Sequence, residues 1–207
     1  MRMAPQPRGR MDIVDLDAVQ MLWVLRRMRD DGKYLDGRSM KFPPKYFLGA
    51  AASPFASEPR FQALREHKKV NAGAQFFQTN LVFDPDGLDE WLNALAQRNI
   101  LDKVYILIGI TPLKSVKMAE YMHFEVPGVT IPEKYLKRMQ SAGDNAEEEG
   151  IQIALELIEA VKGKQGVNGI HLMAVGWEEI VPRILKDSGL APEIESLPEI
   201  GSPVPVK

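Results

Sequence analysis

The stretch VYILIGI, residues 104–110, decides the fold class of this chain of 207 residues. It is the longest apolar run in the sequence, and Thr111-Pro112 ends it. A run of this length is typical of a strand that is buried on both faces of a parallel sheet. A membrane helix needs about 20 apolar residues. We therefore expect a buried parallel strand here and no segment that spans a membrane.

The segments on either side of this strand alternate in type. Short apolar runs predict three more strands, at residues 46–52, 75–83 and 169–175. Apolar residues at three- and four-residue steps predict helices around them. A helix followed by four strand–helix pairs indicates an α/β fold in which right-handed crossovers join parallel strands. The helices are expected at residues 15–30, 58–72, 88–97, 113–123, 133–141, 145–161 and 177–187.

This pattern occupies one predicted domain, residues 15–190. Residues 1–14 form an N-terminal lead that contains arginines but lacks the apolar segment of a secretory signal. Residues 191–207 contain four prolines and little periodicity, so we expect an extended or disordered tail.

Composition excludes several classes of function. Apolar residues make up 45% and charged residues 26% of the chain, as in ordinary globular proteins. A formal net charge of −2 gives no overall attraction to nucleic acid or to an anionic membrane, so neither is expected as a partner. The chain has no cysteine, and its three histidines are too far apart in sequence for a helical zinc motif. We expect no metal, and a reducing, cytoplasmic location fits.

In parallel α/β folds, ligands bind at the carboxyl ends of the strands. Small side chains at Ala51, Ala52 and Ser53 would let a flat ligand approach the backbone there, and tight packing of strand against helix explains them equally well. The other predicted strand ends are residues 78–80, 111–113 and 174–177.

Gln78 and Asn80 share one face of their predicted strand because side chains alternate with period two. Their neighbours are mostly apolar, and each buried polar group without a partner costs about 1–3 kcal/mol. We therefore expect the two amides to bind a ligand, with an internal hydrogen-bond network as the alternative. Each amide carries a donor and an acceptor, which suits a heterocycle such as a pterin or a flavin.

Three further side chains have both a functional and a structural interpretation, and a fourth has a structural one. Arg65 and Lys69 are one helical turn apart, so both could reach a phosphate, although such charged runs most often face solvent. Trp177 could stack on a planar ring or anchor the last helix. His171 lies in an apolar strand, where we expect a core residue with satisfied hydrogen bonds.

Five short motifs follow one another in an order that resembles the methylenetetrahydrofolate reductase family. They are KKVNAGA at residues 68–74, QTN through FD at 78–84, GITP at 109–112, PGV and IP within 127–132, and GIH at 169–171. The resemblance implies a (β/α)8 TIM-type barrel that reduces 5,10-methylenetetrahydrofolate to 5-methyltetrahydrofolate through FAD. This is a step of one-carbon metabolism that serves methionine biosynthesis. The electrons would come from NAD(P)H or from another redox subunit.

The resemblance also implies cofactor contacts. Lys69 matches a family lysine that helps to hold the FAD phosphates, and Arg65 falls at a second flavin-contacting position. Ala51, Ala52 and Ser53 occupy the strand end that passes along the flavin, where many relatives have an aromatic residue in place of Ser53.

Three residues are expected on the substrate side. Asn80 stands where the family commonly has a glutamine that contacts folate and nicotinamide, and it is one methylene shorter. Gln78 lies on the same strand face as Asn80, and we expect both amides to contact the folate. Trp177 stands where some relatives direct an arginine toward the folate tail.

The resemblance implies that the four predicted strands are barrel strands five to eight. The family's catalytic glutamate lies on strand one, so no residue here is assigned as the proton donor. We expect a folate substrate, an N-terminal half-barrel or a redox partner subunit, and an oligomeric assembly.

Two other functions remain open. A half-barrel has two unpaired strand edges that favour association, as expected of a non-catalytic remnant or an interaction subunit of a redox complex. Alternatively, the chain is a folate-binding methyltransferase-like module that binds 5-methyltetrahydrofolate without a flavin.

Overall fold

The structure, a computed structural model, describes residues 16–191. The predicted N-terminal lead and the tail beyond Ala191 lie outside the described residues. Three short 3-10 helices within this range are η2 (Leu101–Lys103), η3 (Gly143–Asn145) and η4 (Glu178–Ile180). The α-helices and strands are α1 (Ala18–Asp30), β1 (Gly49–Ala52), α2 (Pro59–Ala72), β2 (Phe76–Leu81), α3 (Pro85–Ala96), β3 (Tyr105–Ile110), α4 (Val116–Glu125), α5 (Glu133–Ser141), α6 (Ala146–Val161), β4 (Gly169–Leu172) and α7 (Val181–Asp187).

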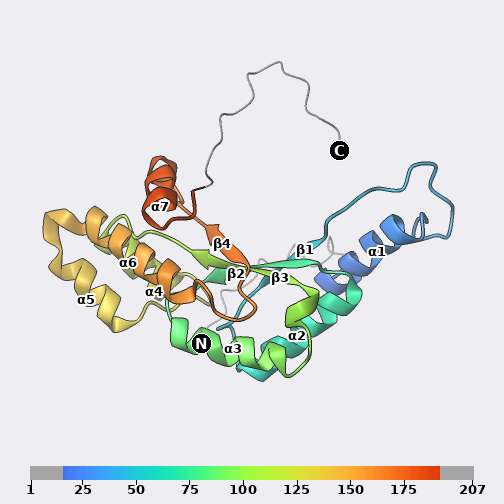
Figure 1. Cartoon of the computed structure of the whole chain (residues 1–207), viewed down its shortest axis with the longest axis horizontal. Helices are drawn as coiled ribbons and strands as arrows, with labels where there is room; N and C mark the ends of the chain where they lie inside the picture. The colour runs from blue at the N-terminus through green and yellow to red at the C-terminus, as the bar shows by residue number, and fades with distance from the viewer. Residues whose placement is uncertain (1–15, 192–207) are drawn as a thin grey trace, which may run out of the picture.

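The four strands form one parallel sheet in the order β1-β2-β3-β4. In the register, Ala51 lies beside Gln78, Gln78 beside Leu107, and Leu107 beside Gly169. The helices follow one another in an arc around the sheet from α1 to α7 (Figure 1). The predicted α/β fold with parallel strands is confirmed. Its sequential strand order is that of TIM-like barrels, whereas the strand order of doubly wound sheets reverses.

Local sequence signals explain where the helices begin and end. α2 begins with Pro59, whose fixed φ suits a first helical position, and Gly73, with φ of 124°, follows its last residue. α4 begins later than the predicted residue 113 because the Ser115 hydroxyl accepts the N–H of Met118 at 3.2 Å and caps the helix there. The last predicted helix likewise begins with the 3-10 turn η4 before α7.

The helices cover only one face of the sheet. Along β2, Phe77, Thr79 and Leu81 are buried, whereas Gln78 is exposed and Asn80 is half-buried on the opposite face. The prediction that the strands are buried on both faces is therefore wrong for the described residues, because α2, α3 and α6 pack beside one another on a single side. We call the uncovered side the open face. It consists of Ala51, Phe76, Gln78, Asn80, Tyr105, Leu107, Gly109, Gly169 and His171.

The covered face holds the hydrophobic core. Phe77 of β2, Ile108 of β3, Trp91 of α3 and Leu157 of α6 are all completely buried. Because these side chains come from distant parts of the sequence, their packing holds the crossover helices against the sheet. None of the helices within residues 16–191 combines the length and the apolar character needed to cross a bilayer.

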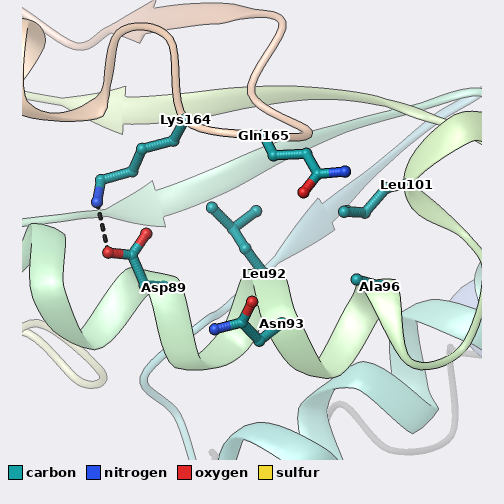
Figure 2. A pocket seen from close by; sticks show the side chains of 7 residues that line it. All are labelled: Asp89, Leu92, Asn93, Ala96, Leu101, Lys164 and Gln165. Carbon is teal, nitrogen blue, oxygen red and sulfur yellow. Dashed lines mark hydrogen bonds and ion pairs between the residues drawn. The ribbon is translucent and has the colours of Figure 1, made fainter.

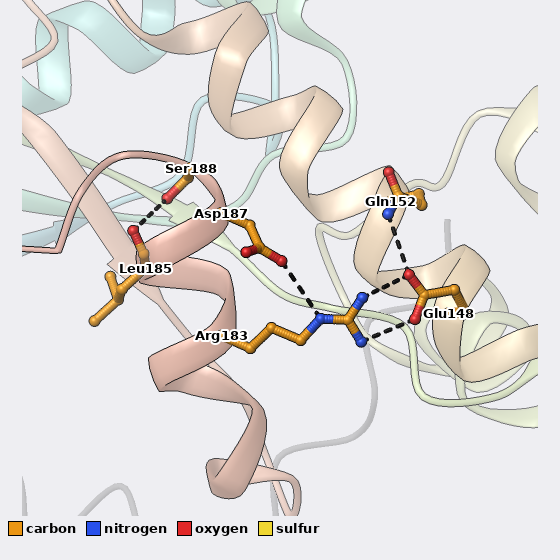
Figure 3. Close-up of polar contacts among 6 residues, drawn as sticks. All are labelled: Glu148, Gln152, Arg183, Leu185, Asp187 and Ser188. Atoms are coloured by element: carbon orange, nitrogen blue, oxygen red, sulfur yellow. Dashed lines mark hydrogen bonds and ion pairs between the residues drawn. The ribbon is translucent and has the colours of Figure 1, made fainter.

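Ion pairs join α6 and α7 at the surface. Arg183 of α7 donates two hydrogen bonds to the carboxylate of Glu148 of α6, at 2.8 and 2.6 Å, and a third to Asp187 at 3.4 Å (Figure 3). The guanidinium lowers the pKa of the Glu148 carboxyl below its usual value. Because these side chains are about half exposed, they orient α7 more than they stabilise the fold.

We predict that Gly109→Ala lowers the free energy of unfolding by about 1–3 kcal/mol, measured by urea denaturation. A Cβ at Gly109 would lie 2.6 Å from the carbonyl oxygen of Thr79 and 2.9 Å from that of Asn80, and these backbone atoms cannot move aside cheaply. Gly169→Ala is the matched control, because its Cβ would meet only the flexible end of Leu107, at 3.0 Å. Equal stability of the two variants would contradict the close approach of β2 to β3.

Candidate ligand-binding site

An irregularity in β2 lies toward the carboxyl end of the open face. The register of β2 against β3 shifts between Gln78 and Leu81, as in a β-bulge. The hydroxyl of Thr79 takes the place of a backbone acceptor of the sheet, because it accepts the N–H of Gly109 at 2.8 Å. The same hydroxyl donates to the carbonyl of Asn80 at 2.8 Å. Bulges redirect side chains and are frequent beside active sites. This local geometry therefore marks the end of β2 as a candidate site.

The side chain of Asn80 is held in one orientation by its own backbone neighbour. Its Oδ1 accepts the N–H of Leu81 at 2.9 Å. Its Nδ2 forms no hydrogen bond within residues 16–191, and it lies 3.6 Å from where a Cβ of Gly128 would stand. The loop between α4 and α5 thus passes beside this amide. Asn80 is left with a free donor, which can bind an acceptor atom of a ligand.

The chemistry of the open face changes along the strands. At the amino ends, Phe47 stacks on Phe76 with 5.4 Å between ring centroids, and Tyr105 lies 6.3 Å from Phe47. Together with Leu107 and Asn168, these rings line a hollow of about 410 Å³. The face is therefore aromatic where the strands begin. Where the strands end it is polar and carries Gln78, Asn80 and His171.

Lys69 of α2 is directed at the edge of β1. Its Nζ donates to the carbonyl oxygen of Ala51 at 2.7 Å and lies 3.5 Å from the carboxylate of Glu66, and its side chain is 13% exposed. Glu66 is 1% exposed, and its Oε2 has no hydrogen-bond partner within the described residues. Burial raises the pKa of the Glu66 carboxyl, an effect that Lys69 partly offsets. Arg65, in contrast, is exposed.

The three small residues at the end of β1 point in different directions. Ala51 is exposed and lies beside Gln78 in the register of the sheet. Ser53, just after the strand, is half-buried. Ala52 is 1% exposed and packs in the core. Ala51 and Gln78 therefore meet on the open face, and the side chain of Ala52 does not reach it.

Trp177 is buried where β4 leads into η4. It is 6% exposed, and its backbone N–H closes a turn to the carbonyl of Ala174 at 3.0 Å. Lys114, in the loop after β3, lies over the indole with its Nζ 5.4 Å from the ring centroid. One face of the ring is thus occupied by a cation, and Lys114 brings positive charge to the carboxyl ends of the strands.

A second hollow, of about 290 Å³, lies between α3 and the turn before β4 (Figure 2). Lys164 and Asp89 form an ion pair of 2.6 Å on its wall, and Leu101 of η2 lines it. Because η2 and this turn precede β3 and β4, the hollow is at the amino ends of the strands, away from Gln78 and Asn80. In the part of the chain that the structure describes, no cluster of three or more His, Asp or Glu side chains could hold a metal.

His171 lies on the open face of β4 and not in the core. The prediction of a core histidine with satisfied hydrogen bonds is wrong, because its Nδ1 is buried without a partner in residues 16–191 and its side chain is only half-buried. The period-two alternation of β4 was the available signal. Ile170 and Leu172 pack against the core, so the residue between them must face the same side as Gln78 and Asn80.

The sequential parallel sheet, with polar side chains at its carboxyl ends, is characteristic of TIM-barrel-like α/β proteins. A sequence profile described as methylenetetrahydrofolate reductase matches residues 16–189 of this chain. The chain therefore belongs to the methylenetetrahydrofolate reductase family, as its five motifs predicted.

Two relatives from Schizosaccharomyces pombe are methylenetetrahydrofolate reductase 2, 26% identical over 132 residues, and methylenetetrahydrofolate reductase 1, 24% identical over 132 residues. The chain spans about a fifth of their length: the matches cover 59% and 60% of this chain but 20% and 21% of the relatives. A similar solved structure is an uncharacterized protein from Clostridium thermocellum that binds two copies of 5-methyl-5,6,7,8-tetrahydrofolic acid. It is 20% identical, has a TM-score of 0.50, and matches over 79% of this chain and 68% of that one, which supports the fold.

We predict that Thr79→Val destabilises the protein by about 1–3 kcal/mol, because the N–H of Gly109 then loses its acceptor in a buried position. Thr79→Ser is the matched control, since it keeps the hydroxyl and removes one methyl group, worth about 0.8 kcal/mol. Urea denaturation of both variants measures the difference. If the serine variant were as unstable as the valine variant, the hydroxyl would not be supporting the bulge.

We predict that Glu66→Gln stabilises the protein near neutral pH. The pKa of Glu66 is higher in the folded than in the unfolded protein, so ionisation opposes folding above the folded pKa. This penalty disappears below about pH 4, where the carboxyl is protonated in both states. The gain in the free energy of unfolding should thus be present at about pH 7 and shrink as the pH falls to about 4.

Urea denaturation at the two pH values measures this difference. The control is Glu90→Gln, the same substitution at an exposed carboxylate, which should change stability little at either pH. A Glu66→Gln variant that is less stable than the unaltered protein at neutral pH would mean that the ion pair with Lys69 outweighs the cost of burying the charge.

Proposed function

We propose that this chain is part of a methylenetetrahydrofolate reductase and that the polar carboxyl end of its open face binds the reduced folate. Family membership over residues 16–189 supports an oxidoreductase that converts 5,10-methylenetetrahydrofolate to 5-methyltetrahydrofolate. The observation that carries the proposal is the pair of amides, Gln78 and Asn80, on the open face of β2. In this class of fold, ligands bind at that end of the sheet.

The amides match the donors and acceptors of a pterin. Asn80 offers its free Nδ2, while Gln78, which is exposed, offers both an oxygen and a nitrogen. Trp177 and Lys114 lie together at the ends of the neighbouring strands. We assign Lys114 to the carboxylates of the folate tail, with Trp177 as the support that holds this lysine in place.

The edge of β1 fits an anionic cofactor such as FAD. Ala51 and Ser53 are small, so a flat ring can approach the backbone. The ammonium of Lys69 already lies at this edge, 2.7 Å from the carbonyl of Ala51, and it can exchange that oxygen for a phosphate oxygen, with Arg65 one turn away. The buried carboxylate of Glu66 lies 3.5 Å from this ammonium and helps to position it.

FAD, when bound, would supply the hydride that the methylene carbon of the folate receives, and NAD(P)H would replace those electrons. Within this chain, Lys69 and Arg65 hold the cofactor, and Gln78 and Asn80 orient the pterin. No residue here is assigned as the proton donor. The absence of cysteine fits our further proposal that the reaction takes place in the cytoplasm.

The unpaired edges of the outer strands and the exposed open face favour association with another protein segment. β1 and β4 are the outer strands of the described sheet, and the aromatic end of the open face exposes 59% of Phe47 and 58% of Tyr105. In our proposal, β1 to β4 are barrel strands five to eight. Strands one to four, from the same polypeptide or from a separate N-terminal half-barrel, would pair with both edges and provide the proton donor. Association with such a half or with a redox partner subunit makes the assembly oligomeric.

The position of Lys69 also favours a second candidate, a folate-binding module without a flavin. Its ammonium already has the carbonyl of Ala51 as an acceptor and Glu66 as a counter-ion. Binding of FAD therefore separates the two candidates.

We predict that the protein binds FAD and that Lys69→Met weakens this binding at least about tenfold, which corresponds to about 1.4 kcal/mol. Titration of the protein with FAD, followed by flavin fluorescence, measures the affinity. Lys164→Met is the matched control, since this lysine is paired with Asp89 in the hollow at the other end of the sheet (Figure 2) and should not affect FAD.

Binding of 5-methyltetrahydrofolate without any binding of FAD would contradict the proposed reductase and support the folate-binding module. Binding of neither compound would indicate a non-catalytic remnant or an interaction subunit.

A further inference from the structure

His171 faces the same space as the proposed folate contacts. It is the third residue of β4, and its partner in the register of β3 is Gly109. Gly109 in turn lies beside the bulge that carries Asn80. His171 and Asn80 are thus two strand spacings apart, about 10 Å, on the same face of the sheet.

The β3 residue between these two side chains is a glycine, so no side chain of β3 projects between them. Gly109 has no side chain to fill the gap, and the methyl group of Met173 lies over it, with Cε 2.7 Å from where a Cβ would stand. The hydroxyl of Thr111 donates to the carbonyl of Met173 at 2.7 Å and holds the chain there. Gly109 and the soft thioether of Met173 thus form a floor between Asn80 on one side and His171 on the other. A flat aromatic ring packs well against such a floor.

The imidazole of His171 has unused hydrogen-bonding capacity. Its Nδ1 is buried and has no partner among the described residues, and its Nε2 is not among the buried atoms that lack one. A neutral imidazole carries one donor and one acceptor. Because no hydrogen bond of the ring exists among the described residues and only Nδ1 is buried, Nε2 is the nitrogen that a ligand atom can reach.

We propose that His171 binds the pterin ring of the reduced folate from the side opposite Asn80, and that Met173 supports the face of the ring. This inference rests on the proposed function, because it requires folate at the carboxyl ends of the strands. It assigns a binding role to a residue of the GIH motif, for which the family resemblance gave no role.

The first test compares variants of His171 by isothermal titration with 5-methyltetrahydrofolate. His171→Leu removes both nitrogens and should weaken binding about tenfold. His171→Gln keeps a polar group near the position of Nε2 and should recover most of the affinity. His67→Leu is the matched control on α2 and should bind as the unaltered protein does. Equal affinity of the leucine variant and the unaltered protein would overturn the proposal.

The second test needs no variant and therefore does not depend on the stability of one. The chain has three histidines, so the ring nitrogens of each can be followed by long-range proton–nitrogen NMR. Addition of 5-methyltetrahydrofolate should shift the ring signals of His171 and leave those of His67 in place. Folate binding without a shift at His171 would overturn this inference alone. No folate binding by the unaltered protein would overturn the proposed function, and this inference with it.

Discussion

Side chains alternate between the two faces of the parallel sheet, and the helices cover only one of these faces. This alternation divides β2 into Phe77, Thr79 and Leu81 in the core and Gln78 and Asn80 on the open face. Because all four strands are parallel, their carboxyl ends meet at one end of the sheet, and polar side chains from distant parts of the sequence gather there. The candidate site depends on this geometry more than on any single motif.

Two features of the site depart from the regular pattern of a sheet and a core where ligand contacts are proposed. The bulge in β2 requires the hydroxyl of Thr79 and the absence of a side chain at Gly109, and in return it fixes the amide of Asn80. The buried carboxylate of Glu66 keeps one oxygen without a partner beside Lys69. Local rules of folding are broken at such places because binding needs groups that the protein itself leaves unpaired.

The sequence was sufficient to predict the order of helices and strands, the parallel sheet and the placement of polar residues at the strand ends. These properties follow from local periodicity, as in the apolar run at residues 104–110. The uncovered face could not be predicted, since apolar runs look alike whether one or two layers cover them. The orientation of Lys69 toward Ala51 and the unpaired nitrogen of His171 also escaped prediction, because both depend on contacts between separate elements.

The central claim is that folate binds at the polar carboxyl end of the open face. The most direct measurement maps the backbone amide chemical shifts of the protein during titration with 5-methyltetrahydrofolate. The claim predicts that the largest changes fall at Gln78 to Asn80, Gly109 and His171. Changes confined to the hollow around Asp89 and Lys164, at the opposite end of the sheet, would contradict it.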